Sequence, residues 1–239
     1  MNSRTLASLA LALGLLSATT QAAFHVMQIE EFIAGINGNT SAQAIQLRMR
    51  SAGQNVVSNG RVQAWDANGA NPVLLIDMAT NVTNSSAGDN VLLTSSAFNT
   101  IMASVGGYSS DFTLTNTIPL SYLTGGKITF ENSTGSIIYW SLAFGAYAGT
   151  NTGSTQNDTD GNFGTPTVAP PTGSRQGIRF TGAATALSTT NAADYALTTN
   201  PATVRNNARL SFTVVPEPGS LALLAALALG GIALARRRS

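Results

Sequence analysis

Between residues 24 and 214, short runs of hydrophobic and β-branched residues alternate with clusters of Gly, Asn, Ser and Thr. Runs of this length, bounded by turn-forming residues, predict β-strands, and some show strict alternation of hydrophobic and polar side chains. In one of them Ile45 and Leu47 face one way, and Gln46, Arg48 and Arg50 face the other. The predicted strands are Phe24–Ile33, Gln43–Met49, Asn55–Trp65, Val73–Met78, Val91–Thr94, Asp111–Thr115, Lys127–Glu131, Ser136–Ala143, Gln176–Thr181 and Ala208–Val214.

One segment follows a helical period instead. In Ser95–Val105 the side chains of Phe98, Ile101, Met102 and Val105 fall on one face. Many short strands and one short helix predict an all-β fold, an antiparallel immunoglobulin-like sandwich that spans residues 23–214. Residues 151–174 lack any hydrophobic period and are rich in Gly, Pro, Asn and Thr, which predicts a long mobile loop.

The first 22 residues follow a different pattern. Arg4 precedes an apolar stretch from Leu6 to Leu16, and the small residues Thr20 and Ala22 lie where a signal peptidase would cleave. This layout predicts a secretory signal peptide over residues 1–22, so we expect the chain to be exported.

The last segment, residues 215–239, is unlike the body as well. Pro216, Glu217 and Pro218 are followed by uncharged residues from Leu221 to Ala235 and by Arg236–Arg238. A helix over residues 221–235 would be about 22 Å long, shorter than the roughly 30 Å of a bilayer core, and the arginines would hold its end in the cytoplasm.

These residues resemble the PEP-CTERM sorting signal of Gram-negative bacteria: a Pro-Glu-Pro motif, a short transmembrane helix and a basic cluster. The resemblance implies recognition by exosortase, a membrane-embedded transpeptidase that processes its substrates near the motif. It also implies a transient inner-membrane anchor, followed by release to the cell surface or extracellular matrix, with exopolysaccharide as a possible partner.

Several pieces of the body occur in the order of a lamin-tail-type domain, an immunoglobulin-like sandwich of secreted bacterial proteins. They are Ile29–Glu31, Ala44–Leu47, Gly126–Phe130, Ile137–Trp140 and Ala193–Asn207, and the sequence departs from the family where Gln46 replaces its usual Glu.

Composition narrows the chemistry that the body can perform. The absence of cysteine removes thiol catalysis and thiolate metal sites. Outside the terminal segments eight basic residues face a slight excess of acidic ones and form no basic stripe, so we expect no nucleic-acid binding.

Candidate sites are few. His25, the single histidine, lies near the predicted new N-terminus, where it is poorly placed for a catalytic triad or a zinc site. Asp158 and Asp160 precede Gly161 and suggest a loose calcium site that could include Asn157, although a solvated loop tip explains them as well.

Carboxylate chemistry on glycans would need two acids across a cleft, and we expect Glu30 and Glu31 to alternate to opposite faces of a strand. The other acids considered for such a pair are Asp66, Asp77, Asp89, Asp111 and Glu131. The aromatic residues fit core packing better than a sugar-stacking platform; they are Trp65, Tyr108, Tyr122, Tyr139, Trp140, Tyr147 and Tyr195.

These patterns favour a non-catalytic structural or interaction protein of the cell surface or extracellular matrix, without a cofactor other than possible calcium. The alternatives are a carbohydrate- or ice-binding module and a glycan-active enzyme that uses carboxylates.

Overall fold

The computed structural model describes residues 23–216. The predicted signal peptide, the predicted helix over residues 221–235 and the basic cluster lie outside the described residues. None of the helices within residues 23–216 has the length and hydrophobicity that a membrane span requires.

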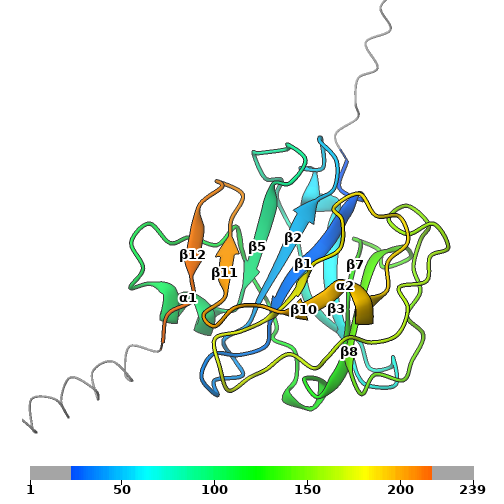
Figure 1. The fold of residues 1–239 in the computed structure, drawn as a ribbon. Helices are drawn as coiled ribbons and strands as arrows, with labels where there is room; N and C mark the ends of the chain where they lie inside the picture. The colour runs from blue at the N-terminus through cyan, green and yellow to red at the C-terminus, as the bar shows by residue number, and fades with distance from the viewer. Residues whose placement is uncertain (1–22, 217–239) are drawn as a thin grey trace, which may run out of the picture.

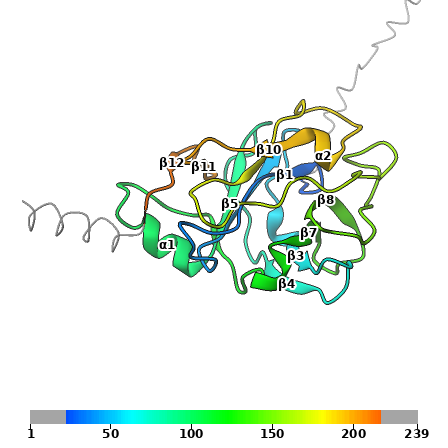
Figure 2. The ribbon, with the colours of Figure 1, turned by 60° about the horizontal axis from the view of Figure 1, so that its bottom comes forward.

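The body consists mostly of β-structure in two main sheets, which Figure 2 shows as two layers. A six-stranded sheet has the order β10-β9-β1-β2-β5-β6, a four-stranded sheet the order β4-β3-β7-β8, and β11 and β12 form a separate hairpin. The strands are β1 (Met27–Ile33), β2 (Ala44–Met49), β3 (Gly60–Trp65), β4 (Val73–Asp77), β5 (Asn90–Thr94), β6 (Phe112–Thr113), β7 (Gly125–Asn132), β8 (Ile138–Gly145), β9 (Ile178–Phe180), β10 (Tyr195–Leu197), β11 (Thr203–Arg205) and β12 (Ser211–Thr213). The helices are α1 (Ser96–Met102) and α2 (Asn191–Asp194), with short 3-10 turns at Val57–Asn59 and Leu120–Tyr122.

The two main sheets pack face to face through the hydrophobic side chains that alternate along their strands. Ile29 of β1 and Leu47 of β2 belong to the same buried cluster as Phe130 of β7 and Leu142 of β8. The alternation predicted for Gln43–Met49 is confirmed, because its hydrophobic positions enter this core and its polar positions point away.

Most of the expected strands are present, and the arrangement of the strands differs from expectation in two respects. Strands β5 and β6 pair in parallel, so the six-stranded sheet is not purely antiparallel. Two short strands, β10 and β11, form in the stretch Ala193–Asn207, for which no strand was predicted. The helix is confirmed: the Ser95 hydroxyl accepts a hydrogen bond from the Phe98 amide, which caps α1 at its first turn.

A second, smaller core covers part of the outer face of the six-stranded sheet, the face turned away from the other sheet. Leu92 of β5 contacts α1 and the β11–β12 hairpin there, together with Phe98, Val204 and Phe212. In Figure 1 the hairpin and α1 lie together at one side of the sheet. The rest of the outer face carries polar side chains.

Strand β1 contains a β-bulge that changes the expected direction of two carboxylates. The register with β2 shifts between Ile29 and Glu31, so that Glu31 pairs with Gln46 and Glu30 is the extra residue. Both glutamates therefore leave the sandwich core, and Phe32 returns to it. The expectation that Glu30 and Glu31 point to opposite faces of the strand is wrong.

Residues 151–174 form a long loop without helices or strands, as predicted, and parts of this loop are packed against the sandwich. Asn157 and Phe163 are fully buried, and the ring of Phe163 packs edge-on against Trp140 with 5.2 Å between the ring centroids. The Asn157 side chain donates hydrogen bonds to the carbonyl oxygens of His25 and Tyr139. The ring of Phe163 and the amide of Asn157 thus attach this segment to the sandwich, although the sequence of the segment has no hydrophobic period.

Candidate binding cleft

The outer face of the six-stranded sheet contains a polar cleft of about 780 Å³ beside the β11–β12 hairpin. Its volume lies within the range of about 300–1,000 Å³ that is typical of ligand sites. The lining residues are Glu30, Gln46, Arg48, Ser86, Ala87, Gly88, Asp89, Asn90, Arg179, Thr203, Arg205, Arg209 and Ser211. Half of the eight basic residues of the body meet here.

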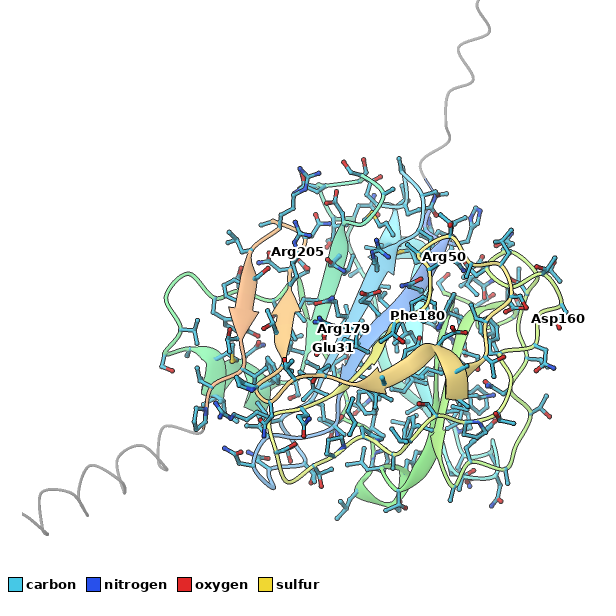
Figure 3. All side chains as sticks on the ribbon, in the orientation of Figure 1. Glu31, Arg50, Asp160, Arg179, Phe180 and Arg205 are labelled. Carbon is cyan, nitrogen blue, oxygen red and sulfur yellow. The ribbon has the colours of Figure 1, made fainter. Side chains whose placement is uncertain are left out.

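The four arginines come from distant parts of the chain. Arg48 belongs to β2, Arg179 to β9 and Arg205 to β11, while Arg209 lies in the turn between β11 and β12. In Figure 3 Arg179 lies beside Glu31 on the sheet, and Arg205 lies at the β11–β12 hairpin, to which it belongs. Sheet pairing and the packing of the hairpin bring the four side chains together.

Two of these arginines are held by carboxylates. Arg179 donates to Glu31, with 2.7 Å between Nε and Oε2, and a further short hydrogen bond joins Arg179 to the carbonyl oxygen of Thr203. Arg209 contacts Asp89 through two parallel hydrogen bonds of 2.7 and 2.9 Å. Such pairs hold the guanidinium groups in a defined orientation.

The other two arginines are different. Within residues 23–216 the guanidinium groups of Arg48 and Arg205 make no hydrogen bond or ion pair, although both residues are half-buried. Arg48 acts on Glu30 and Arg205 acts on Asp89 only through longer-range attraction between charges. The backbone amide of Arg205 donates to Oε1 of Gln46 at 2.5 Å, which fixes the position of β11 over β2.

The two glutamates of the bulge lie in an unusual environment for carboxylates. Burial raises the pKa of Glu31 to about 7, and the charge of Arg179 only partly offsets this effect. Burial raises the pKa of Glu30 as well, against a hydrogen bond of 2.5 Å from Gln28 Nε2 and the charges of Arg48 and Arg179. Oε1 of Glu31 is buried and has no hydrogen-bond partner among residues 23–216.

Neither Asp158 nor Asp160 lines this cleft. Both belong to the segment that is hydrogen-bonded to β8 through Asn157 and Tyr139, and Figure 3 shows Asp160 away from Arg179 and Arg205. Asp158 is buried, and its Oδ2 accepts hydrogen bonds from the amide and hydroxyl of Thr189 at 2.7 and 2.8 Å. The side chain of Asp160 is exposed and accepts from the Asn162 amide. A solvated tip therefore describes Asp160 and not Asp158.

Calcium at this segment stays a prediction. A side-chain hydrogen bond with Asp158 and a backbone hydrogen bond from the Asn162 amide lower the pKa of Asp160, which favours its charged form. Within residues 23–216, however, no three acidic or histidine side chains gather closely enough to hold a metal ion.

The remaining candidates take part in local structure. His25 packs against Tyr139 with 5.8 Å between the ring centroids. Asp66 accepts hydrogen bonds from the amides of its own turn, and buried Glu131 accepts from Arg61, Gln63 and Thr129. Four of the seven aromatic residues considered above are buried, as expected for core packing; these are Tyr139, Trp140, Tyr147 and Tyr195.

Sequence reasoning did not identify the arginine cleft. The polar positions of β2 indicated a solvent-facing side, but nothing local connects Arg48 to three arginines more than 130 residues further along the chain. The bulge at Glu30 also has no Gly or Pro to mark it.

Comparison with known families gives one result. Residues 214–239 match the PEP-CTERM protein-sorting motif, which confirms the signal predicted from Pro216, Glu217 and Pro218. Proteins with this motif are substrates of exosortase: they are exported, processed at the membrane and then associated with the cell surface. No curated protein sequence matches the chain.

Proposed function

We propose that this chain is an exported, exosortase-sorted protein of the cell surface or extracellular matrix, with a non-catalytic interaction role. The sorting motif at residues 214–239 is the observation that carries the proposal. The predicted signal peptide supports it, and so does the compact β-sandwich between the two signals, for which we infer the immunoglobulin-like arrangement of lamin-tail-type domains.

The sorting motif begins directly where the folded body ends. The backbone of Val214, a buried residue, donates to the Ala202 carbonyl at 3.0 Å and accepts from Arg175 at 3.3 Å. Only Val215 separates this anchored residue from Pro216. The sorting enzyme would therefore work close to the folded body.

Replacing Pro216, Glu217 and Pro218 by alanine tests the sorting role. We expect export to continue and an unprocessed, membrane-bound form to accumulate, which cell fractionation and immunoblotting would detect. Alanines at exposed Thr80, Thr185 and Ser188 form a matched control that should be processed normally. Normal release of the motif variant would contradict the proposal.

One observation favours a second candidate, a glycan-active enzyme. Glu30 and Glu31 share one face of the sheet at the polar cleft, and burial raises the pKa of both, as in carboxylates that act as general acids. Against this, the Glu31 carboxylate is bound to Arg179 and the Glu30 carboxylate to Gln28. If the full chain hydrolysed a polysaccharide and Glu30→Gln abolished that activity, the result would favour the enzyme.

The third alternative, ice binding, would need a flat and regular array of threonines. The cleft offers charged guanidinium groups instead, so it does not support that alternative.

A further inference from the structure

We propose that the arginine cleft binds an acidic sugar chain, with the guanidinium groups of Arg48 and Arg205 pairing to carboxylate or sulfate groups of the ligand. This inference rests on the interaction role proposed above and specifies its ligand class. The shared chemistry is an oxyanion carried on a polyhydroxylated scaffold.

The first argument is charge. Four arginines and two carboxylates line the cleft, and the carboxylate of Glu31, which is bound to Arg179, leaves a net charge of +1. Residues 23–216 as a whole, in contrast, have more acidic than basic side chains. Charge of one sign collected in a concave site raises the local concentration of oppositely charged ligands. The cleft therefore attracts anionic ligands, although the body as a whole carries a negative net charge.

The second argument is the contrast among the four arginines. Arg179 and Arg209 are each bound to a carboxylate of the protein, while Arg48 and Arg205 keep all their guanidinium donors free of protein acceptors within residues 23–216. A guanidinium presents donors in a planar fork that matches carboxylate and sulfate oxygens. Both residues line the cleft and are half-buried, so their donors are available to a ligand that binds there.

The third argument is that the site is held in shape before a ligand arrives. Arg205 lies on β11, which is fixed to the sheet by the hydrogen bond of its amide with Gln46 and by the bond between Arg179 and the Thr203 carbonyl. The Arg48 guanidinium lies beside the turn at Gly88, where an added Cβ atom would be 3.6 Å from its Nη2. A preorganised site loses less conformational entropy on binding.

The fourth argument concerns the uncharged part of the lining. Ser86, Thr203 and Ser211 supply hydroxyl groups, Gln46 and Asn90 supply amides, and no aromatic or large aliphatic side chain lines the cleft. Hydroxyls and amides can exchange hydrogen bonds with sugar hydroxyls. The same lining lacks the aromatic faces on which the bases of single-stranded nucleic acids stack.

The test is calorimetric titration of the full chain in detergent with oligogalacturonate, its methyl ester and a sulfated galactan at low salt. We expect both acidic oligosaccharides to bind and the uncharged ester to bind at least tenfold more weakly. Arg48→Gln and Arg205→Gln should each weaken binding about tenfold, and the double variant about a hundredfold, as is typical for hydrogen bonds between charged groups. Because these guanidinium groups make no protein hydrogen bond, the variants should fold normally.

Arg175→Gln is the matched control, since it removes an arginine outside the cleft and should leave the affinity unchanged. Unchanged affinity of the double variant would overturn the site, and so would a failure of both acidic oligosaccharides to bind. Polyphosphate or single-stranded DNA binding as tightly as the acidic sugars would overturn the ligand class. The tail variant tests sorting separately, because its alanines should not alter binding by the purified chain.

Discussion

Arg48 lies in β2 and Arg50 follows this strand directly, yet the surroundings of the two arginines differ. Arg50 donates hydrogen bonds to the backbone carbonyls of Asn157, Ala184 and Ala186, and its guanidinium lies 5.1 Å from the centroid of the Trp140 ring. Arg48 has no such partner in the described part of the chain, and it lines the open cleft. The end at Arg50 is covered by two loops, and the end at Arg48 is left to solvent.

The difference shows that the role of a polar strand residue depends on what the rest of the chain brings to it. At the covered end the carbonyl groups satisfy Arg50, whose pKa is lowered by burial despite the charge of Asp158. At the open end the acceptors must come from water or from a ligand. The first arginine therefore stabilises the fold, and the second is available for binding.

Replacing each arginine by methionine gives the largest expected effect and separates the two roles. Arg50→Met leaves the carbonyl acceptors without a partner and removes the cation–π contact, so we expect the free energy of unfolding to fall by about 2–4 kcal/mol. Arg48→Met should change it by less than about 0.5 kcal/mol. Denaturant unfolding followed by circular dichroism measures both, and equal losses would contradict the comparison.

The pH dependence of stability tests Glu31, which contacts Arg179 and lies beside Glu30 at the open cleft. Because burial raises the pKa of Glu31 from 4.5 to about 7, the folded protein binds this proton more tightly than the unfolded chain does. The free energy of unfolding should therefore decrease as the pH rises from about 4.5 to about 7, by up to about 3 kcal/mol.

Glu31→Gln should flatten this slope, because an amide does not titrate. Glu131→Gln is a useful control, since it also disrupts a buried ion pair with an arginine, Arg61. Unfolding curves measured between pH 4 and 8 decide the matter, and an unchanged slope in Glu31→Gln would show that another group is responsible.

A smaller effect is expected at the loop that covers Arg50. Asp158→Asn weakens the hydrogen bonds with Thr189 and removes a negative charge that acts on Arg50, so we expect a loss of about 1–2 kcal/mol. If Asp158 and Asp160 also bind calcium, calcium should protect the loop from proteolysis in the unsubstituted protein and not in this variant. Identical digestion with calcium and with chelator would leave Asp158 a purely structural role.

The sequence by itself determined the features that depend on neighbouring residues. The period-two alternation of Gln43–Met49 indicated which side chains enter the core, and the helical period and Ser95 located α1. The Pro-Glu-Pro motif and the residues after it identified the sorting signal, because such a signal is recognised as a linear segment. Periodicity, capping and linear motifs all act over short stretches of chain.

Only the tertiary structure decided where the candidate site lies. The cleft needs β9 beside β1 and the β11–β12 hairpin against β2, pairings between residues up to 159 positions apart, as for Gln46 and Arg205. The bulge at Glu30, the buried carboxylate of Asp158 and the free guanidinium of Arg48 likewise depend on which distant groups arrive beside them. Local preferences select strands and turns, but the packing of distant segments determines which polar side chains are satisfied by the protein and which remain for a ligand.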